Sequence, residues 1–379
     1  MRLLFYATNG LGLGHVTRLL CIIRALRKMD NSHEVLFLTR CEAGPYRKED
    51  DLFTIRIPGP ARARSSGLTP KSYLQMAHPL LWQTVSSFDP HLLVTDTFPE
   101  GPERELAPLM KWPIKKAFVY RDSREGAWEA QGLRKSLEFY QRILVAHAPE
   151  SLALPREFAQ DPRVHFTGTI SERIGENGSR KTLRQRLGLG SEPTAIVTLG
   201  GGGDPEALET LPEIVEGLRR RSIPFFVATG PLTREIPFPV SAREWLPLWP
   251  LAPWLPAFDM AVASGGYNTV AELGSAGLPS LLIPFRRDPD DQEKRVEQAV
   301  REGWGLSAKP DDPSGIGNGL DRLAERAGTA GRVGERTSGV DSGAERAAIL
   351  LLDLVCQKPV LAPPGPGPEK KEITRVPVR

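Results

Sequence analysis

One histidine and one aspartate stand where two predicted parallel strands end. His15 follows the apolar segment RLLFYAT and a loop that contains Gly10, Gly12 and Gly14. Asp96 lies at the end of the apolar segment HLLVTDTF. Because parallel strands of a doubly wound sheet end at one edge, the two side chains are expected to meet there. A neutral imidazole at a helix start can accept a proton, and a carboxylate behind it can stabilise the charged ring. The alternative is that His15 only caps the loop and Asp96 only caps the next helix.

The N-terminal glycine loop departs from the dinucleotide-binding fingerprint. That pattern needs a third glycine and an acidic residue at the end of the second strand. In this sequence His15 takes the third glycine position, and the second strand ends at Arg40. Both departures disfavour NAD as the ligand.

A second glycine run follows the apolar segment TAIVTLG. Asp204 can cap the next helix and Pro205 can start it. Successive glycines are costly in conformational entropy, so an anion site is favoured over a plain turn. The residues expected near the anion are Gly201, Gly202 and Gly203.

The segment SGGYNTVAEL predicts another strand, glycine turn and helix. The strand end, the turn and the helix cap comprise Ser264, Gly265, Gly266 and either Asn268 or Thr269. Glu272 is expected in the first turn of this helix, where a carboxylate can accept hydrogen bonds from two ribose hydroxyls. The alternative is an acid that only complements the helix dipole.

Polar residues follow the apolar segment SLLIPF. Asp291 and Gln292 stand at a predicted helix start and suit hydrogen bonding to sugar hydroxyls, although such a pair is also a common helix cap. Asp288 and Asp290 form an Asp-x-Asp pair, but the proline between them favours a surface turn over a metal site. No metal is therefore predicted.

The order of elements predicts an α/β chain with two doubly wound domains facing across a cleft. The first half predicts strands at 2–8, 34–39, 52–57, 91–98, 114–120 and 142–147 and helices at 15–29, 72–88, 102–110 and 128–140. The second half predicts strands at 164–168, 194–200, 224–230, 259–264 and 280–285 and helices at 205–221, 269–277, 291–303 and 344–356. Apolar runs without alternation are typical of parallel strands that are covered on both faces. We therefore expect domains at 1–165 and 166–356, followed by a disordered proline-rich tail at 357–379.

Composition limits the possible classes of protein. The chain has 379 residues, 40% of them hydrophobic and 25% charged, which is typical of globular domains. A net charge of +3 without a basic stripe argues against nucleic acid as a partner. Three scattered cysteines and no long apolar run favour a cytoplasmic protein without a transmembrane segment. The arginine-bearing segments HVTRLLCIIRALRKM and HPLLWQTV leave peripheral contact with the inner face of a membrane open.

The segments SGGYNTVAELGSAGLPSLLIPF and DDQ resemble the donor half of glycosyltransferase family 28. FDPHLLVTDTFPEGPEREL and VYRDSREG are similar to a branch of uncharacterised predicted glycosyltransferases. The resemblance implies the GT-B fold, in which the C-terminal half binds a nucleotide sugar. A UDP-sugar is the first candidate. It places Gly201, Gly202 and Gly265 to Thr269 around the diphosphate, Glu272 on the ribose, and Asp291 and Gln292 on the donor sugar. The nucleobase is expected to lie against residues 243–246, where Trp245, beside Leu246, forms a wall. His15 and Asp96 take the positions of the family's catalytic pair.

We hypothesise an inverting transfer to a hydroxyl acceptor, in which the helix starts after Gly203 and Gly266 stabilise the leaving diphosphate and no metal or other cofactor is needed. The two arginine-bearing segments leave a lipid-linked acceptor open. One departure is that the family's tandem glutamine is here Gln292-Glu293. Three alternatives stay open: a sugar-nucleotide 2-epimerase, a non-catalytic nucleotide-sugar-binding protein and, disfavoured by the loop, an NAD-dependent dehydrogenase.

Overall fold

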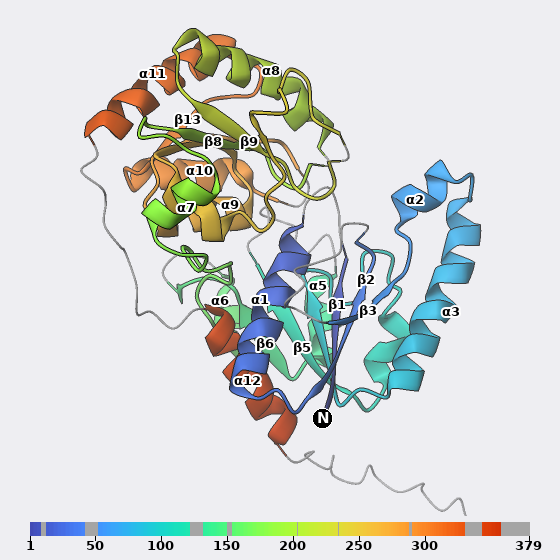
Figure 1. Cartoon of the computed structure of the whole chain (residues 1–379). Coiled ribbons are helices and arrows are strands. Elements are labelled where there is room, and N and C mark those ends of the chain that lie inside the picture. Colours follow the sequence, from blue (N-terminus) through green and yellow to red (C-terminus); the bar gives the residue numbers. More distant parts are fainter. Residues whose placement is uncertain are drawn as a thin grey trace, which may run out of the picture.

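Two parallel sheets, each covered by helices on both faces, make up the computed structural model of the chain (Figure 1). The structure describes residues 1–8, 13–41, 52–121, 132–149, 154–202, 204–233, 235–287, 290–329 and 343–357. Gly10, Gly12, Gly203 and nearly all of the predicted tail lie outside the described residues.

The first sheet has seven strands in the order β3-β2-β1-β4-β5-β6-β7. Its strands are β1 (Arg2–Ala7), β2 (Glu34–Thr39), β3 (Phe53–Arg56), β4 (Leu92–Asp96), β5 (Lys115–Tyr120), β6 (Arg142–Val145) and β7 (Val164–Phe166). The second has six strands in the order β10-β9-β8-β11-β12-β13. Its strands are β8 (Ala195–Thr198), β9 (Phe225–Ala228), β10 (Trp245–Leu246), β11 (Met260–Ser264), β12 (Ser280–Ile283) and β13 (Gly305–Ser307). All neighbouring strands are parallel, which confirms the predicted fold class.

Helices or 3₁₀ turns connect most of the successive strands. The longer ones are α1 (Gly14–Met29), α3 (Pro70–Phe88), α8 (Pro205–Arg220), α9 (Tyr267–Ala276), α10 (Gln292–Arg301), α11 (Pro313–Thr329) and α12 (Gly343–Cys356). The shorter ones are α2 (Pro60–Ser65), α5 (Leu133–Ser136), α6 (Arg156–Ala159) and α7 (Arg180–Arg186), with 3₁₀ turns η2 (Ala107–Lys111), η3 (Leu137–Phe139) and η5 (Ala252–Ala257). The predicted helix at 102–110 is thus wrong over most of its length, because only a 3₁₀ turn forms there.

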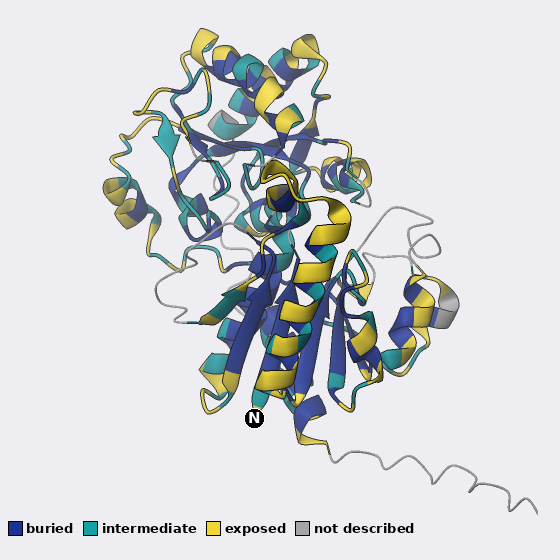
Figure 2. Cartoon of the chain, turned by 90° about the vertical axis from the view of Figure 1, so that its right-hand side faces the viewer, coloured by how far each residue is buried: buried dark blue, intermediate teal, exposed yellow. Residues whose placement is uncertain are grey.

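Alternation along β1 shows how the first sheet is buried on both sides. Leu3 and Phe5 pack into one hydrophobic cluster with α1, whereas Leu4 and Tyr6 pack into another with α3. The central strands of both sheets are accordingly almost entirely buried, whereas the strands β3, β7 and β10 are partly exposed (Figure 2). Apolar side chains on both faces explain the continuous apolar runs in the sequence.

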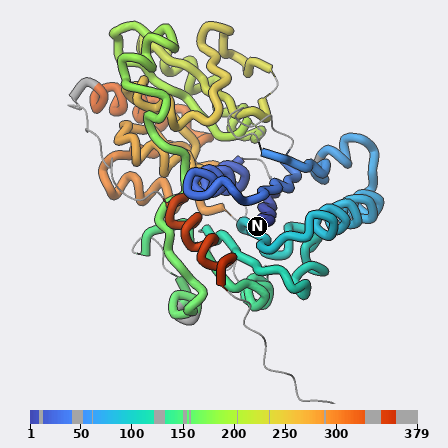
Figure 3. Tube along the Cα trace, turned by 60° about the horizontal axis from the view of Figure 1, so that its bottom comes forward, coloured from blue at the N-terminus to red at the C-terminus, as the bar shows by residue number. Residues whose placement is uncertain are grey.

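Two elements lie elsewhere than the sequence predicts. The strand β7, expected to open the second half, is the last strand of the first sheet. The final helix, α12, crosses back and packs against α1, where Ala347 and Leu351 join the first sheet's core (Figure 3). The helix has an apolar face, but nothing in its sequence says which domain that face covers.

Among the described residues, we find no helix with the length and apolar character needed to cross a lipid bilayer.

Candidate functional site

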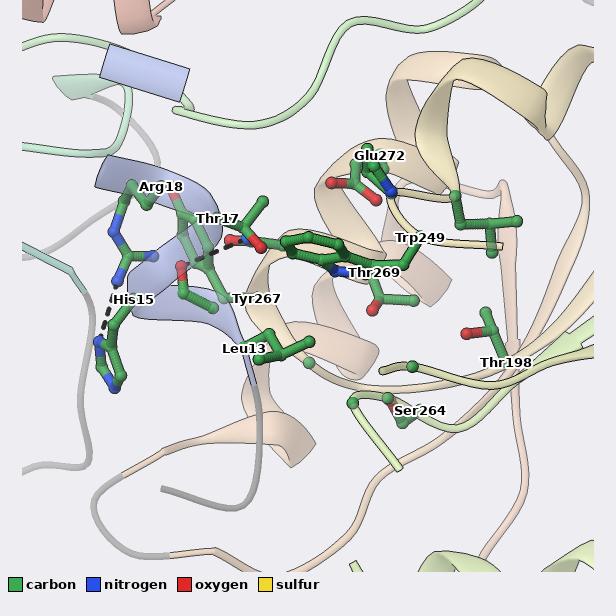
Figure 4. Close-up of a pocket in the computed structure, with 18 of the residues that line it drawn as sticks. Leu13, His15, Thr17, Arg18, Thr198, Trp249, Ser264, Tyr267, Thr269 and Glu272 are labelled. Carbon is green, nitrogen blue, oxygen red and sulfur yellow. Dashed lines mark hydrogen bonds between the residues drawn. The ribbon is translucent and has the colours of Figure 1, made fainter. Parts of the chain in front are cut away.

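A pocket of about 520 Å³ lies between the two sheets, at their carboxyl ends. In Figure 4, His15 and Arg18 of α1 lie on one side of it, and Thr198 and Ser264 of the second sheet lie on the other. The first half also contributes Leu13, Gly14, Thr17, Phe98 and Arg121 to the lining. A ligand in this pocket would therefore contact both halves of the chain.

His15 and Asp96 meet behind the pocket wall, as the sequence predicts. His15 is the second residue of α1, and its Nδ1 lies 2.8 Å from Oδ1 of Asp96 at the end of β4. The imidazole is 14% exposed and lines the pocket, whereas the carboxylate is fully buried. If Nδ1 carries the proton that Asp96 accepts, the unprotonated Nε2 is available to a substrate.

Arg18 holds the same carboxylate from the other side. Its Nε lies 2.7 Å from Oδ2 of Asp96, and its Nη2 lies 2.8 Å from Oδ1. The hydroxyl of Thr97 donates a further hydrogen bond of 2.6 Å to Oδ1. Asp96 is thus held by three side chains besides its own strand.

Burial and these contacts decide the charges of the pair. Burial lowers the pKa of His15 below its ordinary value, although its hydrogen bond to Asp96 opposes that shift. Burial alone would raise the pKa of Asp96, but the Arg18 charge, followed by His15, holds it well below its usual range. At neutral pH the pair is therefore a carboxylate and a neutral imidazole, the form that a general base requires.

The N-terminus of α9 opens toward the same pocket. Gly266 occupies the N-cap position and provides no side-chain cap, so the first amide groups of the helix stay available to an anion. Asn268 and Thr269 lie inside the first turn and line the pocket. Glu272 also lines it, but from the second turn, because the helix begins at Tyr267, earlier than the sequence predicts.

The environment of Glu272 is unusual for a carboxyl group. Burial, and then the charge of Glu172 in the segment that joins the two sheets, raises the pKa of Glu272 to about 8. Glu172 itself pairs with Arg24 of α1, at 2.5 Å. Glu272 can therefore be protonated in the free protein at neutral pH and titrate near it.

Arginines give the pocket its positive charge. Arg121, at the end of β5, crosses to the second half and bonds Oδ1 of Asp290 at 2.6 Å. Arg287 pairs with Asp204, the residue that caps α8 as predicted. Arg286 lines the pocket and makes no ion pair or hydrogen bond within the part of the chain that the structure describes.

The loop after β10 provides an apolar wall. Trp249, together with Leu248, Pro250 and Leu251, lines the pocket. Trp245 and Leu246, the predicted wall, are not lining residues; instead the indole of Trp245 bonds the hydroxyl of Thr229 at 2.8 Å. The predicted segment is close in sequence, but a later tryptophan reaches the pocket.

Comparison with solved structures identifies the architecture. The spinosyn rhamnosyltransferase SpnG aligns with 94% of this chain and 96% of its own at a TM-score of 0.59 and 17% identity. The kitacinnamycin glycosyltransferase aligns with 93% of this chain and 99% of its own at a TM-score of 0.61 and 16% identity. MurG from Acinetobacter baumannii aligns with 93% of this chain and 99% of its own at a TM-score of 0.53 and 16% identity.

The chain has the GT-B fold.

Sequence comparison gives distant relatives of one kind. The UDP-N-acetylglucosamine–N-acetylmuramyl-(pentapeptide) pyrophosphoryl-undecaprenol N-acetylglucosamine transferase of Frankia casuarinae is 28% identical over 136 residues, 33% of this chain and 36% of the relative. The enzyme of the same name from Rhodococcus opacus is 24% identical over 197 residues, 48% of this chain and 50% of the relative. The chain thus spans half or less of the length of these two relatives. No protein-family model matches it.

The GT-B pocket brings together only some of the predicted residues. Those that line it are Gly14, His15, Gly201, Ser264, Gly266, Asn268, Thr269 and Glu272, with Asp96 directly behind. Gln292 does not reach it: its side chain is 1% exposed, and its Oε1 accepts a hydrogen bond from the backbone of Phe285. Asp291 caps α10 and bonds the backbone of Lys294, as the alternative interpretation had it.

Two of the predicted glycines also have a local reason to be glycine. A Cβ on Gly202 would lie 1.9 Å from Oγ1 of Thr233, and the residue has a φ of +89°. A Cβ on Gly265 would lie 2.9 Å from a methyl group of Val296 and 3.0 Å from Cβ of Gln292. Neither Gly202 nor Gly265 is among the residues that line the GT-B pocket.

Sequence reasoning missed the long side chains of the pocket. Arg18, Arg121 and Trp249 reach the site from outside the glycine motifs. One available signal was the spacing of Arg18, which lies one helical turn after His15 and so shares its face. Among the described residues, no group of three or more histidine, cysteine or acidic side chains is placed to hold a metal ion.

Proposed function

We propose that the chain is a glycosyltransferase that moves a sugar from a nucleoside diphosphate to a hydroxyl acceptor with inversion at the anomeric carbon. One observation carries the proposal. The histidine–aspartate pair of the first half faces the open N-terminus of α9 from the second half, within one GT-B pocket. A base and an anion site on opposite domains suit a reaction that joins two substrates.

The base acts on the acceptor. As the acceptor oxygen attacks the anomeric carbon, Nε2 of His15 takes its proton, and Asp96 stabilises the imidazolium that forms. The bond between the anomeric carbon and the phosphate oxygen breaks, and its electron pair leaves with the diphosphate. Attack from the face opposite the leaving group inverts the anomeric centre.

The second half receives the leaving group. The amides at the start of α9 point their partial positive charge at the diphosphate, and Arg286 supplies a full charge. Because these charges balance the negative charge that develops on the diphosphate, the proposed reaction needs no metal ion. Glu272 accepts hydrogen bonds from the ribose, and Trp249 packs against the nucleobase of the donor.

The donor proposed first is a UDP-sugar. The sequence relatives are named as UDP-N-acetylglucosamine transferases, and one structure of the spinosyn rhamnosyltransferase is complexed with thymidine diphosphate. Both nucleotides are pyrimidine nucleoside diphosphates, which favours a pyrimidine in the pocket of this chain. We take residues 1–165 as the acceptor half and 166–356 as the donor half, with α12 packed on the former.

The test is a transfer assay with product analysis. The protein is incubated with each of several UDP-sugars and a panel of hydroxyl acceptors, and released UDP and new glycosides are measured. Acceptor-dependent UDP release that is lost in His15→Ala supports the proposal. Conversion of the donor sugar without an acceptor would instead indicate an epimerase, and binding without conversion would indicate a non-catalytic protein.

A further inference from the structure

Arg18 is a buried cation directly behind the proposed base. Its side chain is 1% exposed and lies one helical turn after His15 on α1. It bonds both carboxylate oxygens of Asp96, at 2.7 and 2.8 Å, and its Nη2 lies 3.4 Å from Nδ1 of His15. Two parallel bonds of this kind fix a guanidinium and a carboxylate strongly.

The same guanidinium also contacts the donor half. Its Cζ lies 5.2 Å from the centre of the Tyr267 ring, within the range of a cation–π interaction. Tyr267 is the first residue of α9, and its hydroxyl donates a hydrogen bond to the backbone oxygen of Ala146 at the end of β6. Arg18 therefore joins Asp96, the partner of the base, to the helix that faces the leaving group.

The charges around His15 explain what Arg18 can do. Asp96 from β4, Arg18 from α1 and Arg121 from the end of β5 are the charged groups of the described residues with the largest effect on the ring. Two uncharged groups also lie beside it: the hydroxyl of Thr97, and the ring of Phe98 with its centre 5.9 Å away. Asp96 alone would favour the imidazolium, and the two arginines oppose it.

We propose that Arg18 is a positioning residue for His15: it shares the negative charge of Asp96, so that the carboxylate orients the imidazole through Nδ1 while the ring stays neutral. The hydroxyl of Thr97 holds Oδ1 of Asp96 independently, at 2.6 Å. The carboxylate consequently stays in place when the charge of Arg18 is removed. What changes is the negative charge that His15 experiences.

The inference rests on the proposed role of His15 as a base, but its test needs no substrate. Protein labelled with ¹⁵N-histidine is titrated by NMR, and His15→Gln assigns the His15 signals among the six histidines. In the wild-type protein at pH 7, the ring is expected to be neutral with the proton on Nδ1. A doubly protonated ring at that pH would overturn the proposal without any variant of Arg18.

The decisive variants are Arg18→Met and Arg18→Lys. Methionine keeps much of the side-chain volume but removes the charge, so the pKa of His15 should rise, because Asp96 is no longer balanced. Lysine keeps a charge and should leave the pKa of His15 close to the wild-type value. A pKa that stays the same or falls in Arg18→Met overturns the proposal.

Arg24→Met is the matched control. Arg24 lies on the same helix but pairs with Glu172, about 13 Å along the axis from His15. Replacing Arg24 should leave the pKa of His15 unchanged. An equal shift of the His15 pKa in Arg18→Met and Arg24→Met would also count against a specific role for Arg18. Because the titration is independent of turnover, a chain without transferase activity would refute the proposed function and leave this result interpretable.

Discussion

The side-chain nitrogen of Asn268 lies 3.5 Å from the backbone oxygen of Gly14. Asn268 is in the first turn of α9, and Gly14 immediately precedes His15 on α1. The contact brings two helix N-termini from opposite sheets together at the pocket. The proposed base and the proposed diphosphate site are therefore neighbours, although Gly14 and Asn268 are 254 positions apart along the chain.

His15→Ala should reduce turnover about 10²–10⁴-fold, the usual contribution of a general base. Binding of UDP should change little, because the imidazole lies on the acceptor side. Steady-state rates and calorimetric UDP affinities of the same preparation check both statements. Activity within a few-fold of the wild-type rate would remove His15 from the mechanism.

Asp96→Asn should destabilise the fold more than the double variant Arg18→Met/Asp96→Asn does. The single substitution leaves a guanidinium that is 1% exposed without its counter-charge, which costs about 3–5 kcal/mol in buried pairs. The double variant removes both charges, so part of this cost should be recovered. Urea unfolding of the wild-type protein, both single variants and the double variant measures the coupling, and purely additive losses would contradict the buried pair.

Glu272 should make stability and donor binding depend on pH in opposite directions. Since its pKa rises from 4.5 to about 8 on folding, the folded chain holds a proton that the unfolded chain releases between these values. Its contribution to the free energy of unfolding is therefore present below pH 4.5 and is lost as the pH rises to about 8. In Glu272→Gln this part of the pH dependence should be absent from thermal unfolding curves.

Donor binding should strengthen as the pH rises from about 7 to 8.5, because the ionised carboxylate accepts hydrogen bonds from two ribose hydroxyls. Binding should then release a proton. Calorimetry of UDP in two buffers with different ionisation enthalpies reports that release. A pH-independent affinity in the wild-type protein would show that Glu272 does not bind the ribose as a carboxylate.

Arg286→Gln should weaken UDP binding about tenfold and leave uridine binding unchanged, because the side chain is proposed to contact phosphate. Arg301→Gln on the exposed face of α10 is the matched control, since Arg301 is not a lining residue. An equal loss of affinity for UDP and for uridine would indicate that Arg286 contacts the nucleoside or stabilises the fold, and not that it contacts the phosphates.

The sequence predicts the parts of the site that depend on local geometry. The meeting of His15 and Asp96 follows from two parallel strands ending at one edge, and the open start of α9 follows from its glycine turn. Contacts between distant segments could not be predicted. The bridge from Arg121 to Asp290 depends on how the two sheets face each other, which no local pattern encodes.

Competition for hydrogen bonds explains why Gln292 does not line the pocket. Its position in DDQ suits a sugar contact, but the free backbone amide of Phe285 lies within reach and binds Oε1 at 3.0 Å. Similarly, α12 packs on α1 rather than on the second sheet because an apolar helix face does not specify its partner.

Isothermal titration of the protein with UDP, dTDP, GDP and NAD, without added metal, distinguishes a nucleotide-sugar site from a dinucleotide site. We expect selective binding of a pyrimidine nucleoside diphosphate, strongly weakened in Glu272→Ala. Binding of NAD alone, or of none of the four, would contradict a nucleotide-sugar site between the two sheets.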